Sequence, residues 1–245
     1  MGMMSDWTPD MIRFMEDASD NSQYHFRLAG ILAEYLEPHW TVCDAGCGTG
    51  YLSIALSPYV KEVTAVDLSA DAIAFLQQKA SIEGLGNIKT ITSDLMKLPG
   101  DMKFDAMVFN YFGKMEQIFE IASKHCLRRI LIIKKNYTDH RFSIGKHPVG
   151  ENGHSQALFY LREHSVNYTA LGFDEDFGQP FRSLADALLF FEIYSRDTDR
   201  SIVKLENIQP RLMKTGNSLF PYYLPNRKSS IIYVVEGGSD GTNHG

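Results

Sequence analysis

Three glycines alternate between Gly46 and Gly50, directly after a run of small and β-branched residues that begins at Thr41. This run predicts a strand over 41–46, and the pattern that follows predicts a helix over 50–57. Glycine has no Cβ, so its backbone can adopt positive φ and a ligand can lie directly against it. The start of a helix also presents free N–H groups and a partial positive charge, which suit an anionic group such as a carboxylate. The stretch therefore predicts a ligand-binding turn between a strand and a helix.

Two acidic residues flank this turn in the sequence. Asp44 stands two residues before the first glycine, and Asp67 ends a second predicted strand over 62–67. A carboxylate at the tip of the second strand can accept hydrogen bonds from both hydroxyls of a ribose. Cys47, inside the turn, and Leu68, directly after the second acid, belong to the same candidate site.

Two classes of cofactor are bound by a glycine loop and a strand-end acid: dinucleotides and S-adenosylmethionine (SAM). The dinucleotide fingerprint is Gly-x-Gly-x-x-Gly, normally without an acid two residues before the first glycine. This chain instead has Asp-x-Gly-x-Gly-x-Gly, with its glycines at Gly46, Gly48 and Gly50. The pattern resembles the first motif of the class I SAM-dependent methyltransferases, and the resemblance extends over residues 40–135. It implies SAM as the cofactor and methyl transfer as the activity.

The resemblance also assigns roles to two later strand ends. In the family, an acid at the position of Asp94 binds the adenine amino group, and the next backbone N–H, here that of Leu95, binds a ring nitrogen. A turn or helix-capping role is the alternative for Asp94. The position of Asn110 faces the methyl group in related enzymes. Asn110 begins a motif similar to Asn-Pro-Pro-Tyr but both prolines are missing, which counts against methylation of DNA adenine or protein glutamine.

Strand and helix patterns alternate through the first part of the chain. Strands are predicted near 41–46, 62–67, 88–92, 104–110 and 128–134, and helices near 50–57, 69–83 and 113–125. Such alternation predicts an α/β fold with a parallel sheet and helices on both faces, in which ligands bind at the carboxyl ends of the strands. The resemblance implies a Rossmann-like, seven-stranded, mostly parallel sheet with an antiparallel last strand near 229–235, and a lid or insertion after strand five.

Four segments are expected along the chain. They are an N-terminal helical cap over 1–39, a SAM-binding Rossmann-like core over 40–135, substrate-pocket or lid elements with the final sheet strands over 136–236, and a disordered tail over 237–245. By resemblance, Tyr24, His25 and Arg27 of the cap are candidates for the substrate pocket, and a helix that only packs on the sheet is the alternative.

The segment 136–227 is rich in aromatic side chains and interrupts the α/β pattern just after strand five. We expect it to cover the carboxyl ends of strands four and five and to enclose a small, partly apolar acceptor together with the N-terminal helices. A second core or a dimer surface is the alternative use of these aromatics. The part from 200 to 227 contains three prolines and is expected to be irregular.

Methyl transfer requires the protein to hold a nucleophile in line with the bond between sulfur and the methyl group. A general base helps where the nucleophile is a hydroxyl or a protonated amine. Tyr111, His147 and His154 are the candidates for that base. The wide spacing of His140, His147 and His154 differs from that of a zinc site, so no metal is predicted.

The composition is that of an ordinary globular protein, with 44% hydrophobic and 22% charged residues. A net charge of −6 disfavours a nucleic-acid partner, because phosphate binding needs a basic face. Three cysteines without a framework spacing favour a reducing, cytoplasmic compartment, and no signal peptide or membrane span is expected. We therefore expect a SAM-dependent methyltransferase with a small-molecule acceptor, and a homodimer is left open. The alternatives are a non-catalytic SAM-binding protein on the same fold and an NAD(P)-dependent oxidoreductase.

Overall fold

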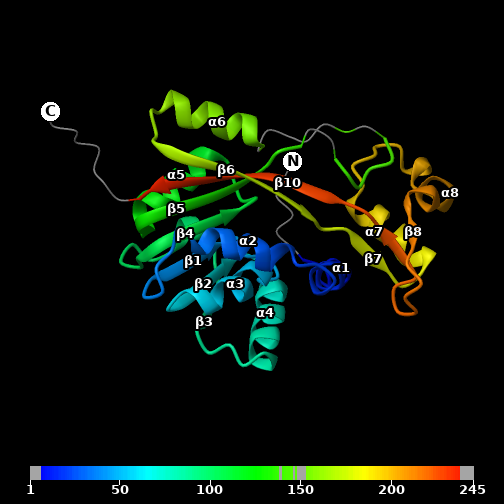
Figure 1. The fold of residues 1–245 in the computed structure, drawn as a ribbon, viewed down its shortest axis with the longest axis horizontal. Helices are drawn as coiled ribbons and strands as arrows, with labels where there is room; N and C mark the ends of the chain where they lie inside the picture. Colours follow the sequence, from blue (N-terminus) through cyan, green and yellow to red (C-terminus); the bar gives the residue numbers. More distant parts are fainter. Residues whose placement is uncertain (1–6, 138–139, 146, 148–152, 238–245) are drawn as a thin grey trace.

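A computed structural model describes residues 7–137, 140–145, 147 and 153–237 (Figure 1). Its main sheet has seven strands in the order β3-β2-β1-β4-β5-β10-β6. The strands are β1 (Thr41–Ala45), β2 (Glu62–Asp67), β3 (Ile88–Thr92), β4 (Phe104–Asn110), β5 (Cys126–Lys135), β6 (Tyr168–Asp176) and β10 (Arg227–Glu236). Strands β1 to β5 are mutually parallel, whereas β10 is antiparallel to both β5 and β6. The predicted seven-stranded, mostly parallel sheet with an antiparallel last strand is confirmed.

Helices cover both faces of this sheet, as predicted. They are α2 (Tyr24–Ala33), α3 (Tyr51–Leu56) and α4 (Ala70–Ile82) on one face, and α5 (Met115–His125) and α6 (His154–Glu163) on the other. Successive strand residues point to opposite faces. In β1, Val42 is therefore buried with side chains of α2 and α3, and Cys43 with side chains of α5. Burial on both faces explains why the central strands are almost continuously apolar.

The antiparallel pairing of the β6 and β10 stretches of chain continues beyond the main sheet (Figure 1). Phe177 and Asn226 exchange two hydrogen bonds, of 2.8 and 3.0 Å, at the point where the main sheet ends. Past this point the same two stretches of chain pair again as β7 (Gln179–Phe181) and β9 (Tyr222–Leu224). The main sheet and the elements that follow it are thus joined by one long pair of strands.

A second, smaller sheet has the order β7-β9-β8, where β8 is Met213–Lys214. The expectation that 200–227 is irregular is therefore wrong over β8, β9 and the short helix α8 (Leu205–Ile208). The physical reason is length, because strands of two or three residues between prolines are too short to show an alternating pattern.

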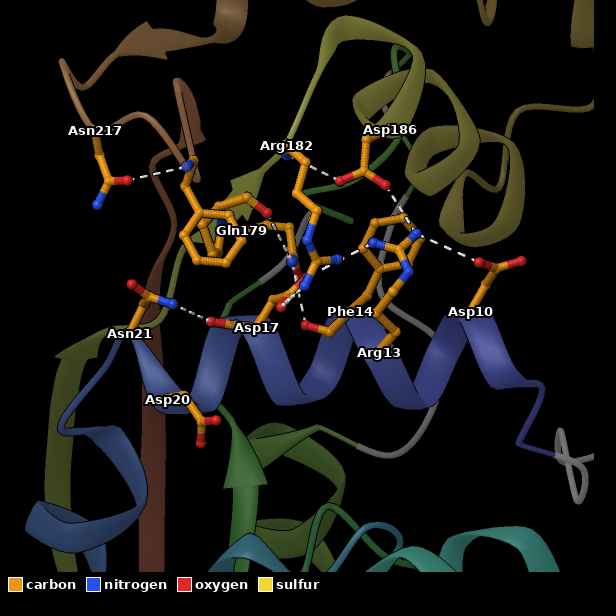
Figure 2. A network of polar contacts seen from close by, with 12 residues as sticks. Asp10, Arg13, Phe14, Asp17, Asp20, Asn21, Gln179, Arg182, Asp186 and Asn217 are labelled. Carbon is orange, nitrogen blue, oxygen red and sulfur yellow. Dashed lines mark hydrogen bonds and ion pairs between the residues drawn. The ribbon is translucent and has the colours of Figure 1, made fainter.

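Helix α1 (Pro9–Asp20) is bound to β7 and to α7 (Leu184–Tyr194) by a polar network (Figure 2). Arg13 pairs with Asp186 at 2.8 Å, and Asp17 pairs with Arg182 at 2.6 Å. Beneath the ion pairs, the ring of Phe14 packs edge-on against Phe190, with ring centroids 5.1 Å apart. Helix α1 therefore forms one packed unit with the elements that follow strand five.

The carboxyl end of α1 contacts the helices α3 and α4 that pack on the main sheet. Asp20 accepts a hydrogen bond of 2.8 Å from the Tyr51 hydroxyl at the start of α3, and it pairs with Lys79 of α4 at 3.1 Å. Helix α1 thus links the glycine-loop region to α7. Of the predicted disordered tail, 238–245 lies outside the described residues, and no helix among the described residues is long and apolar enough to cross a membrane.

Candidate active site

The glycine turn lies at the carboxyl end of β1. Gly46, Gly48 and Gly50 have φ of 73°, 53° and 75°, a left-handed conformation that side chains with a Cβ rarely adopt. The backbone N–H groups of Gly46 and Cys47 donate to the carbonyl of Val66 in β2, at 2.8 and 3.0 Å. The turn is thereby fixed against the end of the neighbouring strand, and the positive φ values expected from the glycines are present.

Two aromatic rings lie against this turn. A Cβ added at Gly46 would stand 2.4 Å from the Phe112 ring, and one added at Gly48 would stand 2.8 Å from the Trp7 ring. A Cβ at Gly50 would instead meet the side chain of Leu76, inside the fold. The first two glycines therefore allow flat groups to contact the backbone, whereas the third allows close packing of α4.

Asp67 lies beside the turn at the end of β2. Its Oδ2 accepts a hydrogen bond of 2.8 Å from the N–H of Gly48, and its Oδ1 accepts one of 2.9 Å from the N–H of Ser69. A carboxylate oxygen can accept more than one hydrogen bond, so both oxygens keep capacity for a ligand. The adjacent Leu68 is 51% exposed and offers an apolar surface next to the carboxylate.

Asp44 has a different environment, because it is buried beneath the turn. Its Oδ2 accepts a hydrogen bond of 2.6 Å from Ser53 of α3. Burial raises the pKa of Asp44 to about 6, and the nearby charge of Asp67 adds to this rise. The residue joins β1 to the first turn of α3, so it fixes the position of the glycine turn from below.

The corner after β4 contains a polar atom without a partner. The side-chain Oδ1 of Asn110 is buried and has no hydrogen-bond partner among the described residues. Tyr111, the next residue, has a φ of 55°, which is strained for a residue with a Cβ. Lys134 of β5 holds the corner by donating to the carbonyls of Phe112 and Gly113, at 2.9 and 2.7 Å. A buried acceptor at a rigidly held corner fits a ligand that brings a donor.

Asp94 and Leu95 lie at the end of β3, close to β2. Asp94 caps a short helical turn, since its Oδ1 accepts from the N–H of Met96 at 3.0 Å. The capping alternative is therefore present in the structure. The N–H of Ser93 donates to the carbonyl of Asp67 at 2.9 Å, and this bond brings the end of β3 next to the end of β2.

The three candidates for a general base lie in different places. The Tyr111 hydroxyl, at the β4 corner, forms hydrogen bonds with Tyr24 (3.0 Å) and Ser230 (2.5 Å). His154 forms a 2.5 Å hydrogen bond with the Tyr233 hydroxyl, on the α5 and α6 side of the sheet. These two residues therefore lie on different sides of the sheet, and Tyr111 adjoins Asn110.

His147 lies in the segment after strand five. Its Nε2 forms a 2.6 Å contact with the buried carboxylate of Asp197. The carboxylate also accepts from Ser195 and from two backbone N–H groups, and these hydrogen bonds hold the pKa of Asp197 well below its ordinary value. Such a pair orients an imidazole, but within the part of the chain that the structure describes, no hydrogen bond or ion pair connects it to the glycine turn. Among the described residues, no cluster of His, Cys, Asp or Glu is arranged to hold a metal.

The pocket candidates of the N-terminal cap have separate environments. Tyr24 is fully buried and bonds to Tyr111, as described above. His25 stacks on Tyr51, with centroids 5.6 Å apart, and burial lowers the pKa of His25 to about 3. Arg27 is exposed and pairs with Glu175 of β6 at 2.7 Å. Tyr24 alone of the three has a contact with the β4 corner.

Two lysines near this corner were not predicted from the sequence. Lys135 ends β5, and Lys228 lies at the start of β10, whose residue Ser230 pairs with Lys135 in the sheet. Because β10 is antiparallel, its first residues reach the same sheet edge as the last residues of β5. The predicted orientation of the last strand was the signal that could have placed Lys228 here.

Comparisons with known proteins agree with the fold. Residues 42–130 match a family described as a methyltransferase domain. The magnesium-protoporphyrin O-methyltransferase of Synechocystis is 39% identical over 83 residues, which cover 33% of this chain and 35% of that protein. The chain spans about one third of the length of the curated relatives that it matches.

Two solved structures cover most of the chain. YcgJ from Bacillus subtilis has a TM-score of 0.56 at 16% identity, with 88% of this chain and 99% of that chain covered. Magnesium protoporphyrin IX methyltransferase from Synechocystis, with bound S-adenosylhomocysteine (SAH), has a TM-score of 0.53 at 16% identity, with 96% and 89% covered. At this identity the two structures show the fold alone. The match over residues 42–130 and the sheet topology agree with the resemblance of this chain to the class I SAM-dependent methyltransferases.

Proposed function

We propose that this protein transfers a methyl group from SAM to a small-molecule acceptor. The observation that carries the proposal is the contact between the N–H of Gly48 and the carboxylate of Asp67, at 2.8 Å. It joins a left-handed glycine turn and a strand-end acid at the carboxyl edge of a parallel sheet, which is where such sheets bind nucleotides.

Each part of SAM can be assigned to residues of this site. The methionine end would lie over Gly46 to Gly50 in place of the Phe112 and Trp7 rings, and the ribose hydroxyls would donate to Asp67. Asp94 and the N–H of Leu95 would receive the adenine. The unpartnered oxygen of Asn110 would accept from a donor of the cofactor or the acceptor. Asp44 and Cys47 would act through the shape of the turn, and Leu68 would pack beside the ribose.

SAM would supply a methyl group on a sulfonium, a good leaving group. The acceptor's lone pair bonds to the methyl carbon as the bond from carbon to sulfur breaks, SAH leaves, and the acceptor's proton passes to a base or to water. The chain's contribution is to hold the acceptor in line, which is worth roughly 7–11 kcal/mol in the best cases. Tyr111 is our candidate for a residue that orients the acceptor, because it adjoins Asn110 and is bonded on both sides.

A small acceptor is supported by two observations. The aromatic residues after strand five enclose a small cavity with α1, rather than forming an open basic groove. The Synechocystis relative is named for a small molecule, magnesium protoporphyrin. A reducing, cytoplasmic location is part of the proposal and rests on three free cysteines, of which Cys43 and Cys126 are buried.

The oxidoreductase alternative is disfavoured by topology. Dinucleotide-binding sheets have parallel strands in the order 3-2-1-4-5-6. Here the antiparallel β10 separates β5 from β6, and the glycine spacing also differs. A non-catalytic SAM-binding protein would share this fold, so only an assay of methyl transfer distinguishes it from an enzyme.

A calorimetric titration with SAM, with SAH and with NAD tests the proposed cofactor. SAM and SAH should bind and NAD should not, and the opposite preference would overturn the proposal. Incubation with SAM carrying a labelled methyl group and a metabolite extract then tests catalysis. Transfer of label to a small molecule supports an enzyme, whereas SAM binding without any transfer favours the non-catalytic alternative.

A further inference from the structure

A small cavity lies between α1, α7 and the start of β10. Its volume is about 80 Å³. It is lined by Met15, Ala18, Phe142, Phe177, Gly178, Gln179, Phe190, Tyr194 and Lys228. The wall is largely apolar, and its polar side-chain groups are the amide of Gln179, the hydroxyl of Tyr194 and the ammonium group of Lys228. The amide of Gln179 is held in place, because its Nε2 donates to the carbonyls of Phe14 and Pro180.

The ammonium group of Lys228 is surrounded by aromatic rings. Its Nζ lies 4.1 Å from the ring centroid of Phe177, 4.7 Å from that of Tyr24 and 5.2 Å from that of Tyr111. Lys135 approaches the Tyr111 ring as well, at 5.7 Å. Two ammonium groups therefore adjoin the same ring.

No carboxylate among the described residues pairs with either lysine. The ion pairs of the structure include neither of them, and the charged groups that act on them are positive: Lys135 acts on Lys228, and Arg196 acts on Lys135. Burial, together with Lys135, lowers the pKa of Lys228 to about 7. Aromatic faces attract a cation, but they replace lost hydration only in part. A partly buried cation without an anion, such as Lys228, is a site at which an incoming anion gains a strong partner.

This site adjoins the proposed methyl-transfer site. Tyr111 follows Asn110 at the end of β4 and contacts the lysines, while the next residue, Phe112, lies against Gly46 of the glycine turn. At the corner after β4, the Tyr111 ring therefore contacts the lysines, and the Phe112 ring contacts the glycine turn.

We propose that this cavity binds a small carboxylic acid with an apolar body, whose carboxylate pairs with Lys228 and whose apolar part lies between α1 and the rings of α7. The role of this molecule as the methyl acceptor rests on the proposed function, whereas its binding to the cavity does not depend on SAM. The cavity is smaller than the ~150 Å³ site that holds benzene in an engineered protein, so the apolar part is smaller than one aromatic ring.

The test uses 3,3,3-trifluoropropionate and its neutral counterpart 3,3,3-trifluoropropanamide as probes, followed by ¹⁹F NMR line broadening on the full chain without SAM. The carboxylate probe should bind the unmodified protein, and the amide probe should bind at least tenfold more weakly. Lys228→Met, which keeps the length of the side chain and removes the charge, should weaken binding of the carboxylate probe about ten- to hundredfold, the usual range for a hydrogen bond to a charged group. It should leave the weak binding of the amide probe unchanged.

Lys214→Met is the matched control, because Lys214 is an exposed lysine on β8 and should not affect either probe. Lys228→Met should keep a melting temperature at least equal to that of the unmodified protein, since it removes a partly buried charge without a partner. Absence of binding by the carboxylate probe, equal binding of the two probes, or unchanged binding of the carboxylate probe in Lys228→Met would each overturn the proposal. Binding of the carboxylate probe without SAM binding would instead keep this site and overturn the proposed function.

Discussion

Gly48 donates its backbone N–H to Oδ2 of Asp67 over 2.8 Å, and this bond joins two strand ends that are separated by a whole helix in the sequence. The carboxylate therefore has two uses. It holds the glycine turn in place, and it keeps lone pairs for the ribose that we propose it binds.

Replacing Asp67 by alanine should weaken SAM binding by one to two orders of magnitude. Hydrogen bonds to charged groups contribute roughly 1.5–3 kcal/mol, and the variant also releases the N–H groups of Gly48 and Ser69. Calorimetric titration with SAM measures the change. Asp71→Ala is the control, because Asp71 is an exposed acid in the first turn of α4 and should leave the affinity unchanged. Equal SAM affinity in Asp67→Ala and the unmodified protein would contradict the placement of the ribose.

The Trp7 ring should report cofactor binding. It lies against Gly48, where the methionine end of SAM is proposed to bind, so SAM must displace it. We expect the tryptophan emission to change in intensity or wavelength during a SAM titration. The change should vanish in Trp7→Phe and persist in Trp40→Phe, because Trp40 is buried in the core of the sheet. A signal that instead depends on Trp40 would show that the ligand does not contact the turn.

Gly46→Ala should reduce both stability and SAM affinity more than Gly84→Ala. Both glycines have positive φ, of 73° and 69°, so each substitution carries a conformational cost of roughly 1–2 kcal/mol. A Cβ at Gly84 meets no atom within 4 Å, whereas one at Gly46 meets the Phe112 ring at 2.4 Å. Urea unfolding and SAM titration of the two variants separate backbone strain from steric contact at the turn. Equal losses in the two variants would show that the contact with Phe112 is unimportant.

The buried carboxyl of Asp44 should make the protein less stable as pH rises from about 4 to about 6. Its folded pKa, about 6, lies above the ordinary value of 3.8, so in this range the folded state retains a proton that the unfolded state has lost. The contribution is fully present below the unfolded pKa and is lost as pH rises through the folded pKa. The total is on the order of 3 kcal/mol. Urea unfolding across this pH range should show a smaller decline for Asp44→Asn, which cannot titrate. The same decline in both proteins would contradict a raised pKa.

The sequence carries most of the information about the cofactor half, because that half is built from local signals. The strand over 62–67 and the glycine turn lie where they were predicted, since apolar runs and glycines act over a few residues. The approach of Lys228 to Tyr111 depends instead on the register in which Ser230 pairs with Lys135, and a single sequence does not contain that register. For the same reason the separation of His147 from His154 could not be foreseen from their even spacing.

The long pairing of β6 with β10 has a consequence for how the chain can be divided. The family match ends at residue 130, but the sheet to which it belongs is completed only by residues 168–176 and 227–236. A fragment that stopped after β5 would leave the buried stretch Ile130–Ile133 as an open, apolar edge, the kind of surface on which chains aggregate. We therefore expect that the segment recognised by sequence does not fold on its own. Insertions that reshape the acceptor side act directly on the sheet that carries the cofactor turn, so the two halves of the molecule cannot be exchanged as separate modules.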